Sequence, residues 1–145
     1  MKEKILEIFK TLGFEMNELE TMGYLFDYEG KRYIWMYSED DEDFLNIAAP
    51  CVVDHENMPE NVFCHLMDKV NGTLKYVKAY KFGGDMWLFY ERELLAGEDL
   101  QEIISHMIIR LDAARAFLRN ELQDTDSGDD SSRVEDDTDE DDKEN

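Results

Sequence analysis

Two short stretches of this sequence carry large apolar side chains at every position, and they limit the folds open to the chain more than any other feature. Residues 33–37 read Tyr-Ile-Trp-Met-Tyr, and residues 86–90 read Met-Trp-Leu-Phe-Tyr. In a β-strand, successive side chains point to opposite faces of the sheet. Both faces of a sheet built from these stretches would therefore be apolar at its centre, and each face needs a cover.

The surrounding sequence predicts helices that can cover one face. Apolar residues recur at helical spacing over 2–12, 59–70 and 99–122. Between the strands, Glu29-Gly30 and Gly83-Gly84-Asp85 are typical hairpin turns. We therefore expect an α+β domain in the order α-β-β-β-α-β-β-α, with a five-stranded, mainly antiparallel sheet. The expected strands cover 24–28, 31–37, 44–53, 73–82 and 86–93.

Charge divides the chain into two parts. The 36 acidic and 15 basic residues give a net charge of −21, and residues 123–145 hold 12 of the acids, 2 bases and one large apolar residue, Val134. Such a segment cannot bury enough surface to offset the entropy of ordering. We expect a single domain over 1–122 and a disordered acidic tail over 123–145. An acidic chain also repels phosphate backbones and anionic lipids, so we expect no nucleic-acid or membrane partner.

The expected location is the cytoplasm. The first residues alternate charged and apolar side chains and do not form the apolar core of a signal peptide. The sequence has no stretch near the ~20 apolar residues that a membrane span needs. Two cysteines, Cys51 and Cys64, do not suggest a disulfide framework, so we interpret them as reduced thiols.

Few side chains are placed for catalysis. Ser105 and His106 are adjacent on a predicted helix, where neighbouring side chains diverge by roughly 100° and cannot act as a nucleophile and its base. The sequence contains no Walker loop, no Rossmann glycine pattern and no HExxH motif. The acidic run 39–43 lacks the spacing of a calcium loop and is expected to be a solvated turn. We expect a protein that is not an enzyme and has no cofactor.

A zinc site is the sharpest chemical alternative, because four potential ligands fall within fifteen positions. Their spacing matches no familiar zinc finger or ribbon, and a free cysteine is commonly a small core side chain. We therefore favour structural roles. The four residues are Cys51, His55, Cys64 and His65.

The face that the helices leave open is the strongest candidate for a functional surface. If the helices cover the face with Ile34, Met36 and Leu88, five rings remain on the other face and form what we call the aromatic platform. Exposed apolar patches usually mark protein interfaces, and Trp and Tyr are favoured anchors. The alternative is that the second helix folds over these rings and makes them core. The aromatic platform consists of Tyr33, Trp35, Tyr37, Trp87 and Phe89.

Three stretches point to a known group of proteins: the helix with Ile5-Leu6-x-x-Phe9, the hairpin over 26–31, and the run from 87–91 through 97–100 into a helix ending at 116–118. In these stretches and in element order, residues 1–122 resemble the type III secretion chaperone-like fold, which includes secretion chaperones and the bacterial YbjN-type sensory-regulator family. The resemblance implies a non-enzymatic binder that commonly forms a homodimer and holds other polypeptides on an apolar surface.

Three functional hypotheses follow. The leading hypothesis is a protein-binding module, similar to a chaperone or regulator, whose aromatic platform holds a segment of another polypeptide. The second is a small-ligand or metal-dependent enzyme domain with a pocket between sheet and helices. The third is that the acidic tail over 123–145 engages basic proteins.

Overall fold

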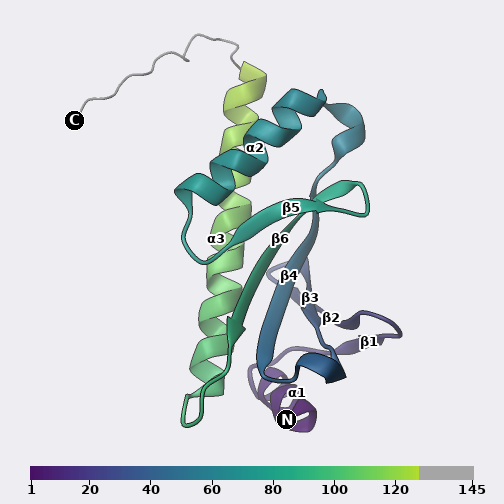
Figure 1. Cartoon of the computed structure of the whole chain (residues 1–145), viewed down its shortest axis with the longest axis vertical. Helices are drawn as coiled ribbons and strands as arrows, with labels where there is room; N and C mark the ends of the chain where they lie inside the picture. The colour runs from purple at the N-terminus through teal and green to yellow at the C-terminus, as the bar shows by residue number, and fades with distance from the viewer. Residues whose placement is uncertain (128–145) are drawn as a thin grey trace, which may run out of the picture.

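The computed structural model of the protein describes residues 1–127 and shows three α-helices and a six-stranded antiparallel sheet in that part of the chain (Figure 1). The strands are arranged in the order β1-β2-β3-β4-β6-β5. The helices are α1 (Lys2–Thr11), α2 (Glu60–Thr73) and α3 (Leu100–Ser127). The strands are β1 (Asn17–Leu19), β2 (Gly23–Tyr28), β3 (Lys31–Met36), β4 (Phe44–Val53), β5 (Lys78–Phe82) and β6 (Asp85–Glu93).

The predicted α+β class and the order of the main elements are confirmed, with one strand more than expected. The additional strand, β1, pairs antiparallel with β2 at the edge of the sheet. Its sequence, Asn-Glu-Leu, contains one apolar residue and no β-branched residue, so no alternating pattern marks it. Strand β5 is shorter than the predicted 73–82, because α2 continues to Thr73 and Tyr76 adopts a left-handed φ of 73°.

The last helix extends beyond the predicted domain boundary at residue 122 and reaches Ser127. Asp99 caps its start as expected, since its Oδ1 accepts hydrogen bonds from the backbone N–H of Gln101 (3.1 Å) and of Glu102 (3.3 Å). Residues 128–145 lie outside the described part of the chain, so the disordered tail stays a prediction. Among residues 1–127, no helix is long and apolar enough to cross a membrane.

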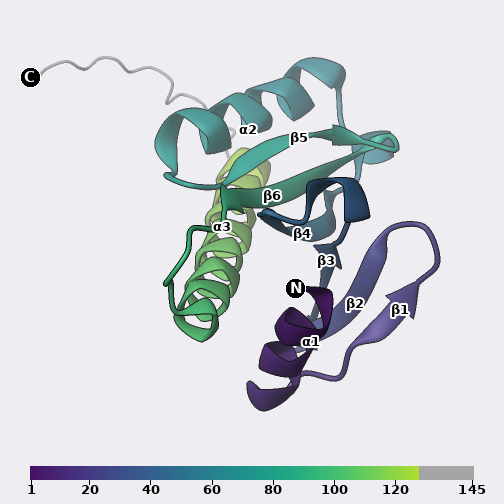
Figure 2. The same ribbon diagram turned by 60° about the horizontal axis from the view of Figure 1, so that its bottom comes forward.

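All three helices contribute to one core on one face of the sheet. Helix α3 contacts β4 and β6, while α2 contacts β5 and crosses the C-terminal half of α3 (Figure 1). There, Lys69 Nζ lies 3.1 Å from Glu121 Oε1. Helix α1 lies at the other end of the molecule (Figure 2). The buried helical residues of this core include Ile5, Phe9, Phe63, Leu66, Val70, Ile104, Met107 and Leu111.

The sheet is irregular where β3, β4 and β6 meet. Strand β3 pairs with β4 only through Ile34 and Trp35. The register between β4 and β6 shifts between Ala49 and Val53, and Cys51 in this interval has a left-handed φ of 49°. An irregularity of this kind bends a strand and re-aims its side chains. The second half of β4 is therefore not paired with the first half of β3.

Candidate binding surface

The sheet register decides which predicted surface residues share a face. Residues directly opposite each other in an antiparallel pair lie on the same face. Ile34 is opposite Ala48, which is opposite Phe89, whereas Trp35 is opposite Ile47. The five rings of the predicted aromatic platform therefore do not lie on one face of the sheet. Its members on β3 lie on the helix-covered face, and Trp87 and Phe89 lie on the opposite face.

The three tyrosine and tryptophan residues at 33, 35 and 37 belong to the helix-side core. Tyr33 and Trp35 are buried, with Trp35 only 1% exposed, and the Trp35 ring packs 5.7 Å from that of Phe9. Tyr37 is half-buried and its ring lies 5.4 Å from Lys2 Nζ. The prediction of one continuous open platform is therefore wrong, because these three rings pack into the helix-side core and stabilise the fold.

The face without helices carries its own apolar cluster, which we call the second-face cluster. Its buried members are Ile34, Ala48, Trp87 and Phe89, and its partly buried members are Leu19, Met22, Leu25, Met36 and Phe82. All of these come from strands and turns, none from a described helix. The rings of Tyr33, Trp35, Trp87 and Phe89 are buried, as the alternative expects. Helix α2 does not cover this second face, however, because its buried residues belong to the helix-side core.

Neighbouring aromatic rings, rather than a helix, shield the centre of this face. Tyr80 stacks on Phe89 with ring centroids 4.3 Å apart, and Phe82 lies 4.5 Å from Trp87. As a result Trp87 is only 8% exposed. The hairpins β1–β2 and β5–β6 lie on either side of β3 and β4 (Figure 2), so the second-face cluster is framed by strands.

A hollow of about 320 Å³ opens beside the second-face cluster, and we call it the second-face hollow. Met22, Met36 and Phe82 contribute to its apolar lining. Phe44, also in the lining, is 46% exposed, which is high for a phenylalanine. The hollow therefore offers an apolar floor and an accessible ring where a side chain of another molecule can insert.

The polar lining of the second-face hollow contains an acceptor without a donor. Asn46 Nδ2 donates to Glu91 Oε2 at 3.1 Å, and Lys78 Nζ lies 2.7 Å from the other oxygen of that carboxylate. Asn46 Oδ1 is buried and receives no hydrogen bond from the described residues. A buried acceptor without a donor costs free energy, and a ligand can reach this shielded oxygen only if the neighbouring side chains move.

Negative charge surrounds this hollow. Asp41 and Glu91 line it directly, and Asp41 belongs to the run of five acids over 39–43. This run forms a turn, as predicted, in which Ser38 Oγ accepts a hydrogen bond from the Asp40 N–H at 3.3 Å. Partial desolvation, followed by the charges of Glu42 and Glu39, raises the pKa of the adjacent Tyr37. Because Lys78 offsets the charge of Glu91, it is Asp41 and its neighbours in the run 39–43 that favour a cationic ligand.

Two of the four predicted metal ligands, His55 and Cys64, contact Glu60 rather than each other. His55 Nε2 contacts Glu60 Oε1, and Cys64 Sγ lies 3.5 Å from Glu60 Oε2, while His65 is exposed on α2. Partial desolvation and the hydrogen bond to Glu60 raise the pKa of the Cys64 thiol, which disfavours the reactive thiolate. Across residues 1–127 no three His, Cys, Asp or Glu side chains are grouped to hold a metal ion.

The other cysteine also lacks an activating environment. Cys51 lies in the irregular part of β4, and partial burial together with Asp85 raises its pKa. Ser105 and His106 are adjacent on α3, as predicted, and His106 Nε2 accepts a hydrogen bond from Arg110 Nε at 3.1 Å. These contacts are structural, and they bring no pair of catalytic groups together.

Of the residues that line the second-face hollow, sequence reasoning predicts only Tyr37 as part of a binding surface and misses the others. It places Met36 on the helix-covered face, and it gives Phe44 and Asn46 no role beyond membership of a strand. The available signal is the polar Asn46 two positions after Phe44, which places both side chains on the same face of β4. That signal becomes informative only with the register of β4 against β6.

Comparisons with known proteins identify a fold but no family. The sequence matches no protein-family profile and no curated protein. The structure is similar to the crystal structure of an uncharacterized protein from Methanothermobacter thermautotrophicus, with a TM-score of 0.59 and 16% sequence identity. The match covers 86% of this chain and 97% of that chain. At this identity the similarity shows a shared α+β antiparallel-sheet fold and nothing about activity.

Proposed function

We propose that this protein is a non-enzymatic binding module that holds a segment of another polypeptide on the second-face cluster and in the adjacent hollow. The observation that carries the proposal is the combination in this hollow of an apolar lining, the exposed ring of Phe44 and the acidic side chain of Asp41. The resemblance of the sequence to secretion chaperones and YbjN-type regulators supports the same class of function. The raised pKa values of both thiols argue against cysteine catalysis.

The charge around the second-face hollow defines the kind of partner. Asp41 and Glu91 line it, and the whole chain has a net charge of −21. We expect a partner segment with apolar side chains flanked by lysine or arginine. A leucine-sized side chain that becomes buried contributes about 2 kcal/mol.

A second copy of this chain is a less favourable partner for the same surface. Both copies would carry a charge of −21, and their acidic rims would meet. Like charges brought together at an interface oppose association. We therefore propose a heterologous polypeptide rather than the homodimer that the resemblance implies.

The test uses the full chain and isothermal titration with two short peptides, one of alternating leucine and lysine and one of alternating leucine and glutamate. We expect saturable binding of the lysine peptide that weakens as salt is raised, and no binding of the glutamate peptide. Replacing Phe44→Ser should weaken binding by about tenfold, since ~1.4 kcal/mol corresponds to that factor.

The matched control is Ile109→Ser on α3, where the isoleucine is 55% exposed and does not line the second-face hollow. This variant should bind the lysine peptide as the unchanged protein does. If Phe44→Ser also leaves the affinity unchanged, the peptide binds elsewhere and the proposed surface is refuted. That result would instead favour attraction to the acidic segment over 123–145.

A further inference from the structure

A second hollow of about 320 Å³ lies on the other side of the molecule and has the opposite charge. Its lining comes from the start of β3, the end of β4 and the C-terminal half of α3. We call it the basic hollow, because three of its lining residues are cations. It is lined by Lys31, Val52, Arg115, Leu118, Arg119 and Leu122, together with Gln123.

Arg115 is held in place at the base of this hollow. Its Nη2 donates a hydrogen bond to the backbone carbonyl of Arg32, and its guanidinium carbon lies 4.8 Å from the centre of the Tyr33 ring. Its Nε is buried and has no acceptor within the described part of the chain. The guanidinium is thus oriented before any ligand arrives, with one donor unused.

The remaining charges leave the basic hollow positive. Lys31 Nζ lies 2.6 Å from Asp112 Oδ1, which also accepts a hydrogen bond from the Tyr33 hydroxyl at 3.2 Å. Arg119 has no ion pair with any side chain that the structure describes, over residues 1–124. Asp112 offsets one of the three cations, so Arg115 and Arg119 are available to one anionic group. This local excess of positive charge stands out in a chain of net charge −21.

The rest of the lining is apolar. Leu118 is buried, and Val52 and Leu122 are half-buried beside it. Binding pockets for small molecules typically measure about 300–1,000 Å³ and combine apolar walls with a few polar groups that orient the ligand. The basic hollow lies at the lower end of that range. Its chemistry fits a single anionic group attached to a short apolar body.

A ligand with many negative charges fits less well. At physiological ionic strength, salt screens the attraction between the two arginines and any ligand charge more than about 8 Å away. The acidic residues elsewhere in the chain repel those distal ligand charges. A single carboxylate avoids this repulsion, because its charge lies next to the two guanidinium groups. The geometry and charge therefore favour a small monoanion over an acidic polypeptide.

We propose that the basic hollow is a binding site for a small amphiphilic carboxylate. The carboxylate pairs with the guanidinium groups of Arg115 and Arg119, and the apolar body rests on Val52, Leu118 and Leu122. This site is on the opposite side of the sheet from the second-face hollow and does not depend on polypeptide binding there.

The test follows the Arg115 Nε–H resonance by NMR of the full chain during titration with octanoate, with octanol as the uncharged probe. We expect octanoate to shift this resonance saturably and octanol to leave it in place. The variant Arg119→Gln should raise the octanoate Kd about fivefold, as expected for the loss of one partly exposed charge pair. It removes a side chain without a described ion pair, so it should not unfold the protein.

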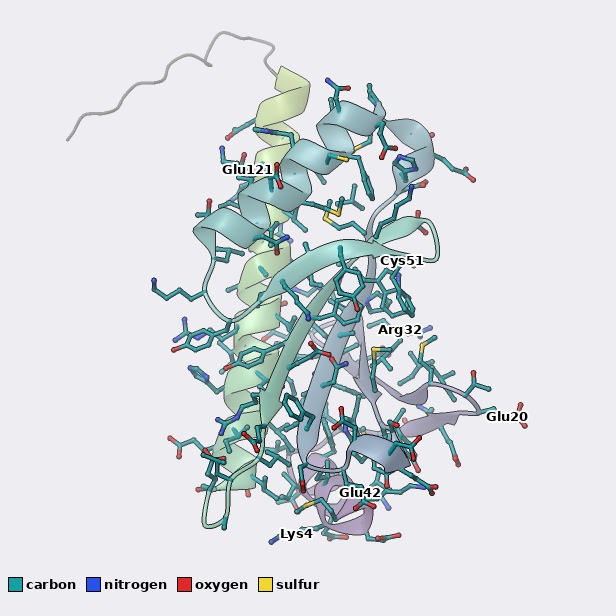
Figure 3. The ribbon with its side chains drawn as sticks, in the orientation of Figure 1. Lys4, Glu20, Arg32, Glu42, Cys51 and Glu121 are labelled. Atoms are coloured by element: carbon teal, nitrogen blue, oxygen red, sulfur yellow. The ribbon has the colours of Figure 1, made fainter. Side chains whose placement is uncertain are left out.

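Lys4→Gln is the matched control, because it removes one positive charge on α1, far from the basic hollow. Figure 3 shows Lys4 at the opposite end of the molecule from Glu121, which is two residues from Arg119 in the sequence. This variant should keep the octanoate affinity of the unchanged protein. The proposal is overturned if octanoate leaves the Arg115 resonance in place, or if octanol shifts it equally. It is also overturned if Arg119→Gln and Lys4→Gln bind octanoate alike.

Discussion

Gly23 offers the sharpest quantitative test of the structure, because a single added methyl group there has nowhere to go. This glycine begins β2, lies opposite Met36 of β3, and has a φ of +139°. A Cβ at this position would lie 1.9 Å from the carbonyl oxygen of Trp35 and 2.9 Å from the backbone nitrogen of Tyr37. Both contacts are with backbone, so no side-chain rotation can relieve them.

The cost of Gly23→Ala follows from these contacts. The start of β2 must retreat from β3 by about 1 Å to reach an acceptable separation. Strain at an unfavourable φ costs roughly 1–3 kcal/mol, and each weakened ladder hydrogen bond costs about 1 kcal/mol. We therefore expect Gly23→Ala to lower the free energy of unfolding by roughly 2–5 kcal/mol.

Alanine variants at two other glycines distinguish the cost of the steric clash from the cost of the backbone conformation. Gly30 has a φ of +78° and nothing within 4 Å of the methyl group that alanine would add, so Gly30→Ala should cost only about 1–2 kcal/mol. Gly72 lies within α2 with open space around it, so Gly72→Ala should stabilise the protein by about 0.5–1 kcal/mol.

Urea unfolding of the full chain, followed by circular dichroism and by the fluorescence of buried Trp35, measures all three variants. The expected order of stability is Gly72→Ala, the unchanged protein, Gly30→Ala and then Gly23→Ala. If Gly23→Ala is no less stable than Gly30→Ala, the close approach of β2 to Trp35 is refuted.

Two further substitutions test contacts that hold neighbouring elements together. The amide of Asn71 accepts from the N–H of Ala79 (2.7 Å) and donates to its carbonyl (2.9 Å), so Asn71→Ala should cost about 2–3 kcal/mol in urea unfolding by detaching α2 from β5. Hydrogen bonds from the backbone N–H of Leu95 and, second, from Arg92 lower the pKa of Glu98 in the folded protein. The ionised carboxylate therefore stabilises the fold at pH values above its pKa in the unfolded chain, and this contribution is lost as the pH falls through its pKa in the folded protein. Unfolding midpoints measured from pH 7 down to pH 3 should therefore fall less steeply for Glu98→Gln than for the unchanged protein, and equal slopes would contradict the assignment.

The sequence was sufficient for the elements whose signals are local. The strands around 33–36 and 86–90, the capping residue Asp99 and the turn at 39–43 all follow from neighbouring residues, and the structure contains each of them. Strand β1 could not be predicted, because Asn17–Leu19 forms a strand by pairing with β2 rather than by any preference of its own.

The candidate site was harder to predict because it depends on long-range register. Each apolar strand has two equivalent faces, and nothing within 33–37 or 86–90 indicates which face of one matches which face of the other. That match is set by β4, where Ala48 joins Ile34 to Phe89. A shift of one residue in β4 would have produced the predicted platform.

The outermost strands narrow how a partner can attach. Strand β1 is three residues long, and β5 at the opposite border bears Lys78 and Lys81 along its five residues. Edge strands that are short or carry lysines pair poorly with an added strand. A short edge offers few free main-chain groups, and charged lysine side chains oppose pairing with another strand. We therefore expect a partner polypeptide to bind to the face of the sheet through its side chains rather than to add a strand at an edge. Its recognition should then tolerate proline, which lacks the N–H that an added strand requires.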